Sequence, residues 1–184
     1  MAFAYSAQRM RAELMGILGN YQISPDAHRQ RGYSATLELV PASGFAVGAS
    51  SLVTHVAEDF RLKVANLRQA HGLFVRAAPA ELLVLLAEGD LILQAPSGAA
   101  SSTGFASMVQ ADVEPLKGLH FIVTGETLTP GTPASRSSYG GWGAIDWFCL
   151  RQLDVRLDLM WRSMAFGPDT LDATAVLVQA HLYL

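Results

Sequence analysis

The pattern of apolar residues divides the chain into a first half that favours helices and a second half that favours strands. Apolar residues recur at helical spacing between Ser6, a residue suited to cap a helix, and Gly19. A second apolar stripe predicts a helix over 52–71, and a third, shorter segment opens at Pro79 and stops at Gly89. The stripe over 52–71 comprises Leu52, Val53, Val56, Phe60, Val64, Leu67 and Ala70.

The clearest alternation in the chain runs from Leu153 to Trp161, where apolar residues are separated by charged ones. A helix would place Arg156 in the middle of its apolar face, so a strand is the better interpretation. The same phase extends back to Ile145 and gives 17 residues, too long for one ordinary strand, so we expect a bulge or turn near 150–152. Further strand candidates are 33–40, 73–77, 90–95, 105–113, 118–126 and 173–184.

These elements together predict the α+β fold class. The amphipathic helices lie mainly in the N-terminal half, and an antiparallel sheet with long strands occupies the C-terminal half. Residues 1–184 are expected to form a single domain. Small and polar residues, with prolines and glycines, predict flexible loops near 96–104 and 129–143.

Composition adds a hint of association and argues against several partners. Hydrophobic residues make up 51% of the chain and charged residues only 16%, which leaves more apolar surface than a lone monomer usually shows. The net charge of −3 supplies no basic field for nucleic acid. The most apolar window, 82–87, is far shorter than the roughly twenty residues of a membrane-spanning helix. The N-terminus lacks a signal-peptide core. We therefore expect no membrane partner, and a location in a virion if the protein is viral or otherwise in the cytoplasm.

A search for chemistry finds no catalytic constellation. The five histidines are scattered, no Gly-x-Ser-x-Gly elbow occurs, and no glycine-rich loop precedes a helix in the way that phosphate binding requires. Cys149 is the only cysteine and lies in an apolar run. The sequence therefore predicts no catalytic, cofactor-binding or metal-binding residues, no cofactor, and no enzymatic activity.

Two groups of residues are candidates for an interface. The charged positions of the alternating segment favour a solvated strand face, with a polar subunit interface as a second interpretation and an acid–base pair as the least favoured. The aromatic residues of the glycine-rich stretch 137–148 favour a core or interface anchor over contact with a small ligand or glycan. The candidate interface residues are Tyr139, Trp142, Asp154, Arg156, Asp158 and Arg162.

The two ends of the chain carry a family resemblance. "SAQRMRAELMGIL" at the start and "TAVLVQAHLYL" at the end resemble the opening helix and closing strand of bacteriophage neck and tail proteins, particularly tail terminators. The resemblance implies a non-catalytic structural protein that forms a homo-oligomeric ring and contacts neighbouring virion proteins. The alternative is a small-molecule or glycan-binding α+β domain, or a cofactor-free enzyme, with an apolar pocket between the sheet and the 52–71 helix.

Overall fold

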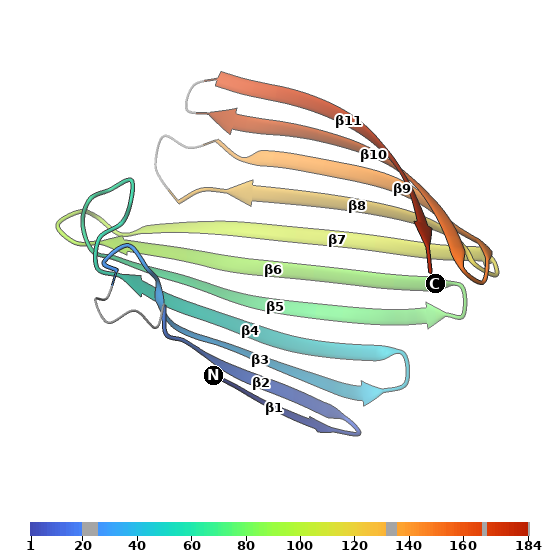
Figure 1. The fold of residues 1–184 in the computed structure, drawn as a ribbon, viewed down its shortest axis with the longest axis horizontal. Coiled ribbons are helices and arrows are strands. Elements are labelled where there is room, and N and C mark those ends of the chain that lie inside the picture. Colours follow the sequence, from blue (N-terminus) through green and yellow to red (C-terminus); the bar gives the residue numbers. More distant parts are fainter. Residues whose placement is uncertain (20–25, 132–135, 167–168, 184) are drawn as a thin grey trace.

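The chain forms one antiparallel sheet in which the strands follow one another in sequence order (Figure 1). The computed structural model describes residues 1–19, 26–131, 136–166 and 169–183, and no residue within these ranges is helical. The strands are β1 (Ala2–Ala7), β2 (Met10–Ile17), β3 (Arg31–Ala42), β4 (Phe45–Val56), β5 (Asn66–Ala80), β6 (Leu83–Pro96), β7 (Ser102–Leu116), β8 (Leu119–Thr129), β9 (Ser138–Leu150), β10 (Leu153–Phe166) and β11 (Asp169–Leu182).

The connections differ between the two ends of the strands. At one end, five turns of two residues each join β1 to β2, β3 to β4, β5 to β6, β7 to β8, and β9 to β10. At the other end, residues 18–30, 57–65, 97–101 and 130–137 form longer connections, and only β10 and β11 are joined there by two residues. The sheet therefore has a short-turn end and a long-connection end.

A repeated hydrogen bond links each short turn to the next hairpin. The backbone N–H of Ala78 donates to the carbonyl of Gly44, at an N···O distance of 2.6 Å. Equivalent bonds join Phe148 to Gly118, Glu114 to Leu82, Val40 to Arg9 and Tyr183 to Gln152, at 2.7–2.9 Å. In every short turn a carbonyl thus accepts a hydrogen bond from a backbone N–H of the following odd-numbered strand, or of the residue just beyond that strand. The hairpin is therefore the repeating unit of the fold.

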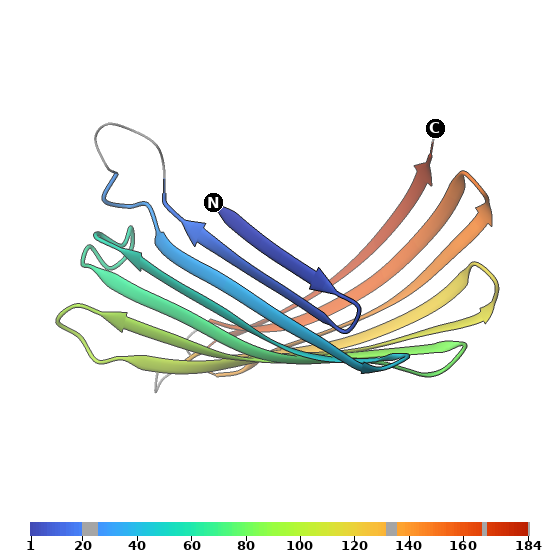
Figure 2. The ribbon, with the colours of Figure 1, turned by 90° about the horizontal axis from the view of Figure 1, so that it is seen from below.

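The sheet is bent into a trough, as Figure 2 shows from a second direction. Nothing in the described part of the chain covers either face of the sheet. The accessible surface is 12594 Å², whereas a compact monomer of this mass exposes about 8,600 Å². Within the described residues, β1 and β11 each pair with a strand on one side only.

The predicted α+β class and its N-terminal helices are wrong, because the predicted helical segments are strands. Residues 6–18 contain the end of β1 and all of β2, and the segment opened by Pro79 lies in β5 and β6. The window 52–71 holds the end of β4, a nine-residue connection and the start of β5. Ser51, which directly precedes this window, lies within β4, where its hydroxyl lies 3.0 Å from Nδ1 of His71.

The turn expected near 150–152 and the two expected loops can each be compared with the strand boundaries. The division predicted near 150–152 corresponds to the two-residue turn between β9 and β10. The expected loop at 96–104 is confined to 97–101. Much of the loop expected at 129–143 is strand, since β9 begins at Ser138, and residues 132–135 of that loop lie outside the described residues.

Candidate functional site

The two faces of the sheet have opposite chemistry. Side chains alternate between faces along each strand, and directly paired residues share a face, so the register assigns every strand position. One face carries Asp154, Arg156 and Asp158 of β10, and the other carries Leu157 and Trp161. The first is called the concave face, because the hollows of the sheet are lined mainly from it.

Charge is concentrated on the concave face. The described strands contain eighteen charged residues other than histidine, and sixteen of them belong to the concave face. The two exceptions, Arg31 and Asp172, lie within four residues of a strand end. The concave residues are Arg11, Arg68, Arg76, Arg156, Arg162, Glu13, Glu38, Glu88, Asp90, Asp112, Glu114, Glu126, Asp146, Asp154, Asp158 and Asp169.

The convex face is mainly apolar, although Ser51, Gln69 and His71 lie on it, and it has aromatic residues near the strand ends. Eight exposed aromatic side chains lie within three residues of a strand end on this face, and Trp161 lies deeper. Those at the short-turn end are Tyr5, Phe45, Phe121 and Trp147, and those at the long-connection end are Phe3, Tyr33, Phe105 and Tyr139. Between the two groups the exposed side chains are mainly aliphatic, such as Leu73, Val109, Val123 and Leu159.

Burial in this protein is inverted relative to an ordinary water-soluble domain. Among the described side chains, only three apolar ones are buried, and seven polar or charged ones are. All of the buried strand residues belong to the concave face, where curvature crowds the side chains together. The buried polar residues are Glu38, Thr54, Asp59, Asn66, Thr124, Asp154 and Asp158.

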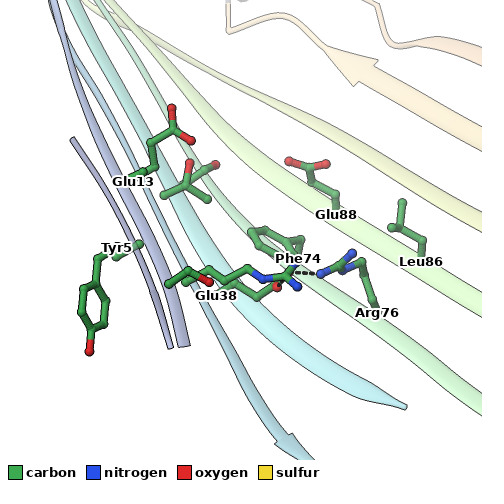
Figure 3. Close-up of a pocket in the computed structure, with 13 residues that line it drawn as sticks. Tyr5, Glu13, Glu38, Phe74, Arg76, Leu86 and Glu88 are labelled. Carbon is green, nitrogen blue, oxygen red and sulfur yellow. Dashed lines mark hydrogen bonds and ion pairs between the residues drawn. The ribbon is translucent and has the colours of Figure 1, made fainter. Parts of the chain in front are cut away.

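One charged cluster spans β2, β3 and β5 beside a hollow of about 670 Å³ (Figure 3). Glu38 accepts a hydrogen bond from Arg76, and Nη1 of Arg11 lies 3.6 Å from the other oxygen of the same carboxylate. In Figure 3, Tyr5 points away from this group, as expected for a residue of the convex face. Glu38 is buried, and the two guanidinium groups compensate its charge.

A second cluster is centred on Arg156 of β10. Its Nε and Nη2 donate to the carboxylate of Asp158 at 2.9–3.0 Å, and its Nη1 lies 3.8 Å from Asp146 on β9. Gln179 of β11 donates to Asp158 at 3.4 Å. One guanidinium therefore joins strands β9 and β10 and, through Asp158, reaches β11. This fork geometry is specific to arginine.

The neighbouring pairs extend this polar ladder. Nδ1 of His181 lies 2.9 Å from Asp154, and Nε of Arg162 lies 3.3 Å from Glu126 on β8. The Arg162–Glu126 pair borders a second hollow of about 560 Å³, which Glu88 and Asp90 of β6 also line. Polar groups thus line the trough from β2 to β11.

Asp59 anchors the connection 57–65, outside the strands. Its Oδ1 accepts the backbone N–H groups of Arg61 and Leu62 at 2.9 and 3.2 Å. Its Oδ2 accepts from Asn66 at 3.2 Å and from Arg68 at 2.5 Å. These hydrogen bonds to the carboxylate lower the pKa of Asp59 from 3.8 to about 2, and the two from the backbone have the largest effect.

The six residues predicted as an interface do not share one surface. Trp142 and the four charged residues of β10 lie on the concave face, whereas Tyr139 is exposed on the convex face. The sequence reasoning also missed the acidic and basic residues of β2 to β8. Their signal was present, because nearly every charged residue falls on one phase of its strand, but using it required the strand boundaries.

The described residues include neither a cluster that could hold a metal ion nor a helix that could cross a membrane. No group of three or more potential ligands could hold a metal ion in that part of the chain. Among the same residues, no helix is long and apolar enough to cross a membrane.

Comparison with known proteins identifies the fold. No family model matches the chain, and no curated protein matches it. The structure is similar to the crystal structure of the outer membrane channel DcaP of Acinetobacter baumannii, with a TM-score of 0.78 over 99% of this chain and 9% sequence identity. The chain covers 61% of that protein, so it spans about three fifths of the channel's length. At this identity the likeness shows the fold.

This likeness corrects three expectations, and the strands themselves correct a fourth. The predicted ring-forming virion component is wrong, as are the location in a virion or the cytoplasm and the exclusion of a membrane, because the matching fold is that of an outer membrane channel. The alternative, a ligand-binding α+β domain, fails because its pocket required a helix at 52–71 that is absent from the described structure. None of the three comparisons bears on the resemblance to tail terminators itself. The segment that suggested an opening helix is, however, strand in the structure.

Proposed function

We propose that this chain forms part of the wall of a β-barrel channel in a bacterial outer membrane. The observation that carries the proposal is the segregation of charge: sixteen of eighteen strand charges face the trough, and the opposite face is mainly apolar. A transmembrane barrel needs this arrangement, with an apolar outer band and a polar lumen.

The dimensions of the strands support the same proposal. From β3 to β11 the strands are 11 to 15 residues long, whereas a strand crosses the hydrocarbon layer with about 9–11 residues. Strands of globular proteins are typically about five or six residues long. The short-turn and long-connection ends, and the aromatic residues near both, match the turns, loops and aromatic girdles of such barrels.

The energetics assign the convex face to lipid and the concave face to water. In lipid, exposed convex residues such as Leu73 and Val123 avoid the cost of apolar hydration, about 25 cal/mol per Å². The opposite orientation would bring five arginines and eleven carboxylates into hydrocarbon, where each charge is strongly unfavourable. The open edges of β1 and β11 also require pairing, since lipid offers no hydrogen bonds to backbone groups. We therefore propose that strands beyond the eleven described complete the barrel.

The prediction that the protein is not an enzyme is retained within this proposal. A channel wall needs a water-filled lumen with fixed charges, and it needs no reacting group. The homo-oligomeric state expected from the composition also stays a prediction.

The three tryptophans of the chain provide a direct test. Trp147 and Trp161 lie on the convex face, at 53% and 47% exposure, whereas Trp142 lies half-buried on the concave face. Three variants would each retain one tryptophan and carry phenylalanine at the other two positions. Reconstituted into vesicles whose acyl chains carry bromine, the variants retaining Trp147 or Trp161 should lose most of their fluorescence, and the variant retaining Trp142 should lose little.

An aqueous quencher supplies the control. Acrylamide should reach Trp142 from the lumen more readily than it reaches Trp147 or Trp161, which lipid shields. Equal quenching of all three tryptophans by brominated lipid would refute the assignment of faces. Absence of lipid quenching in all three variants would refute insertion into the membrane.

A further inference from the structure

The concave face carries more negative than positive charge. It holds eleven carboxylates and five arginines, a net charge of −6 with histidines neutral, although the whole chain has a net charge of only −3. The positive charges therefore lie mainly outside this face, in the turns and connections. A trough lined by one sign of charge raises the local concentration of ions of the opposite sign.

The five arginines of this face are all engaged by carboxylates. Arg11 and Arg76 share Glu38, and Arg162 pairs with Glu126. Arg68 pairs with Asp59, and Arg156 pairs with Asp146 and Asp158. No concave arginine is thus left without a carboxylate partner to attract a passing anion.

Glu88 and Asp90 of β6 are in the opposite situation. No described cationic group lies within 4.0 Å of either carboxylate. Both are half-buried and lie on the same face of the sixth of eleven strands. Glu88 lines the hollows of about 670 and 560 Å³, and Asp90 lines the second of these and a third of about 320 Å³. The uncompensated charge is therefore central in the trough, where a permeating solute must pass.

We propose that the channel favours cations over anions, and that Glu88 and Asp90 contribute to this preference. The inference rests on the proposed channel function and adds the class of solute. Fixed carboxylates that line a pore lower the free energy of a cation and raise that of an anion. The preferred solutes are small cations and positively charged organic molecules, since each arginine that could hold an anion already faces a carboxylate.

The test is the reversal potential of the full-length protein in planar bilayers under a tenfold gradient of KCl. The wild-type protein should pass K⁺ in preference to Cl⁻. In the E88Q/D90N variant the K⁺/Cl⁻ permeability ratio should fall by at least about twofold, because two central charges are lost. The matched control is E58Q/E81Q, which removes two carboxylates from connections outside the strands and should leave the ratio unchanged.

The outcomes separate this inference from the proposed function. A conducting wild-type channel that is unselective or prefers Cl⁻ overturns cation preference and leaves the channel intact. An equal fall of the K⁺/Cl⁻ permeability ratio in E58Q/E81Q and E88Q/D90N overturns the role of Glu88 and Asp90.

Absence of conductance in a protein whose Trp147 and Trp161 are quenched by brominated lipid overturns both cation preference and the channel, but leaves membrane insertion standing. If E88Q/D90N does not fold, the single variants E88Q and D90N give the second readout. Each should lower the K⁺/Cl⁻ permeability ratio, and a ratio unchanged in both overturns the role of Glu88 and Asp90.

Discussion

Two adjacent residues of β7 test the proposed assignment of one face of the sheet to lipid and the other to water. Val109 lies at the centre of β7 (Ser102–Leu116), on the convex face, and is 60% exposed. Met108 precedes it on the concave face and lines the second hollow. Arginine at either position adds the same charge and a similar volume, so the pair of variants V109R and M108R isolates the environment of each face.

The expected magnitudes follow from the register. Arginine on the lipid face near the bilayer midplane costs about 2–4 kcal/mol, a roughly 30- to 1,000-fold loss in the equilibrium between folded and unfolded protein. Met108 is directly paired with Glu88 on one side and Glu126 on the other. An arginine there gains two carboxylate neighbours in a solvated trough, so M108R should change stability by less than about 1 kcal/mol.

The assay is denaturant unfolding in lipid vesicles, followed by the heat-modifiable electrophoretic mobility that folded barrels show. V109R should lower the free energy of unfolding by the amount given, and M108R should stay near wild type. If M108R is the more destabilised variant, the faces have been assigned in reverse. If the two variants are equally mild in lipid, Val109 does not face hydrocarbon.

Three further predictions concern polar groups of known geometry. The pKa of Asp59 is lower in the folded protein, so the contribution of this carboxylate to stability is complete above about pH 4 and disappears as the pH falls towards 2. The difference in unfolding midpoint between the wild-type protein and D59N should vanish over that range. A difference that stays constant down to pH 2 would contradict the mechanism. A Cβ atom at Gly72 would lie 2.3 Å from Oδ1 of Asp90, so G72A should cost about 1–3 kcal/mol by overpacking, and D90A should partly rescue it in the same unfolding assay. Removing Arg156 leaves the buried carboxylate of Asp158 without its cation; R156A should cost about 3–5 kcal/mol, and R156K, which keeps the charge and loses the fork, should cost less.

The sequence predicts the strand character of β10 and misses that of β4 and β5, for a physical reason. On β10 every second residue from Leu153 to Trp161 is apolar, and Asp154, Arg156 and Asp158 separate them, so period two is visible. On β4 the concave positions include Ala46, Gly48, Ser50 and Leu52, which are small or apolar. Both faces of β4 therefore read as weakly apolar, and the stripe fits a helix equally well. Small residues are needed here by the neighbouring strand, since a Cβ at Gly48 would lie 2.3 Å from the ring of Phe74.

The sequence analysis excluded a membrane partner with a criterion that applies only to membrane-spanning helices. A continuous apolar run of about twenty residues is required of a spanning helix, whereas a spanning strand needs only alternate apolar residues over about ten. Two observations pointed the other way: the low charged fraction and the unusual length of the alternating segment. Both were attributed to assembly with other proteins, because protein partners and lipid both accept an exposed apolar face. The structure adds that most of the exposed apolar side chains lie on the convex face and sixteen of the eighteen strand charges lie on the concave face, which only the strand boundaries reveal.

The charges of the concave face also specify the register of the strands. A one-residue slip of β10 would exchange its two faces and place Asp154, Arg156 and Asp158 on the convex side. A two-residue slip preserves the faces but moves Arg156 from its position opposite Asp146 to one opposite Ala144 or Phe148. The apolar convex face alone would tolerate the second slip, because one aliphatic residue replaces another there. The ion pairs between strands oppose it, since Asp146 would lose Arg156 and Glu126 would lose Arg162. In the proposed channel, the charges that line the trough would therefore set the solute preference, and in the sheet they also favour a single pairing of the strands.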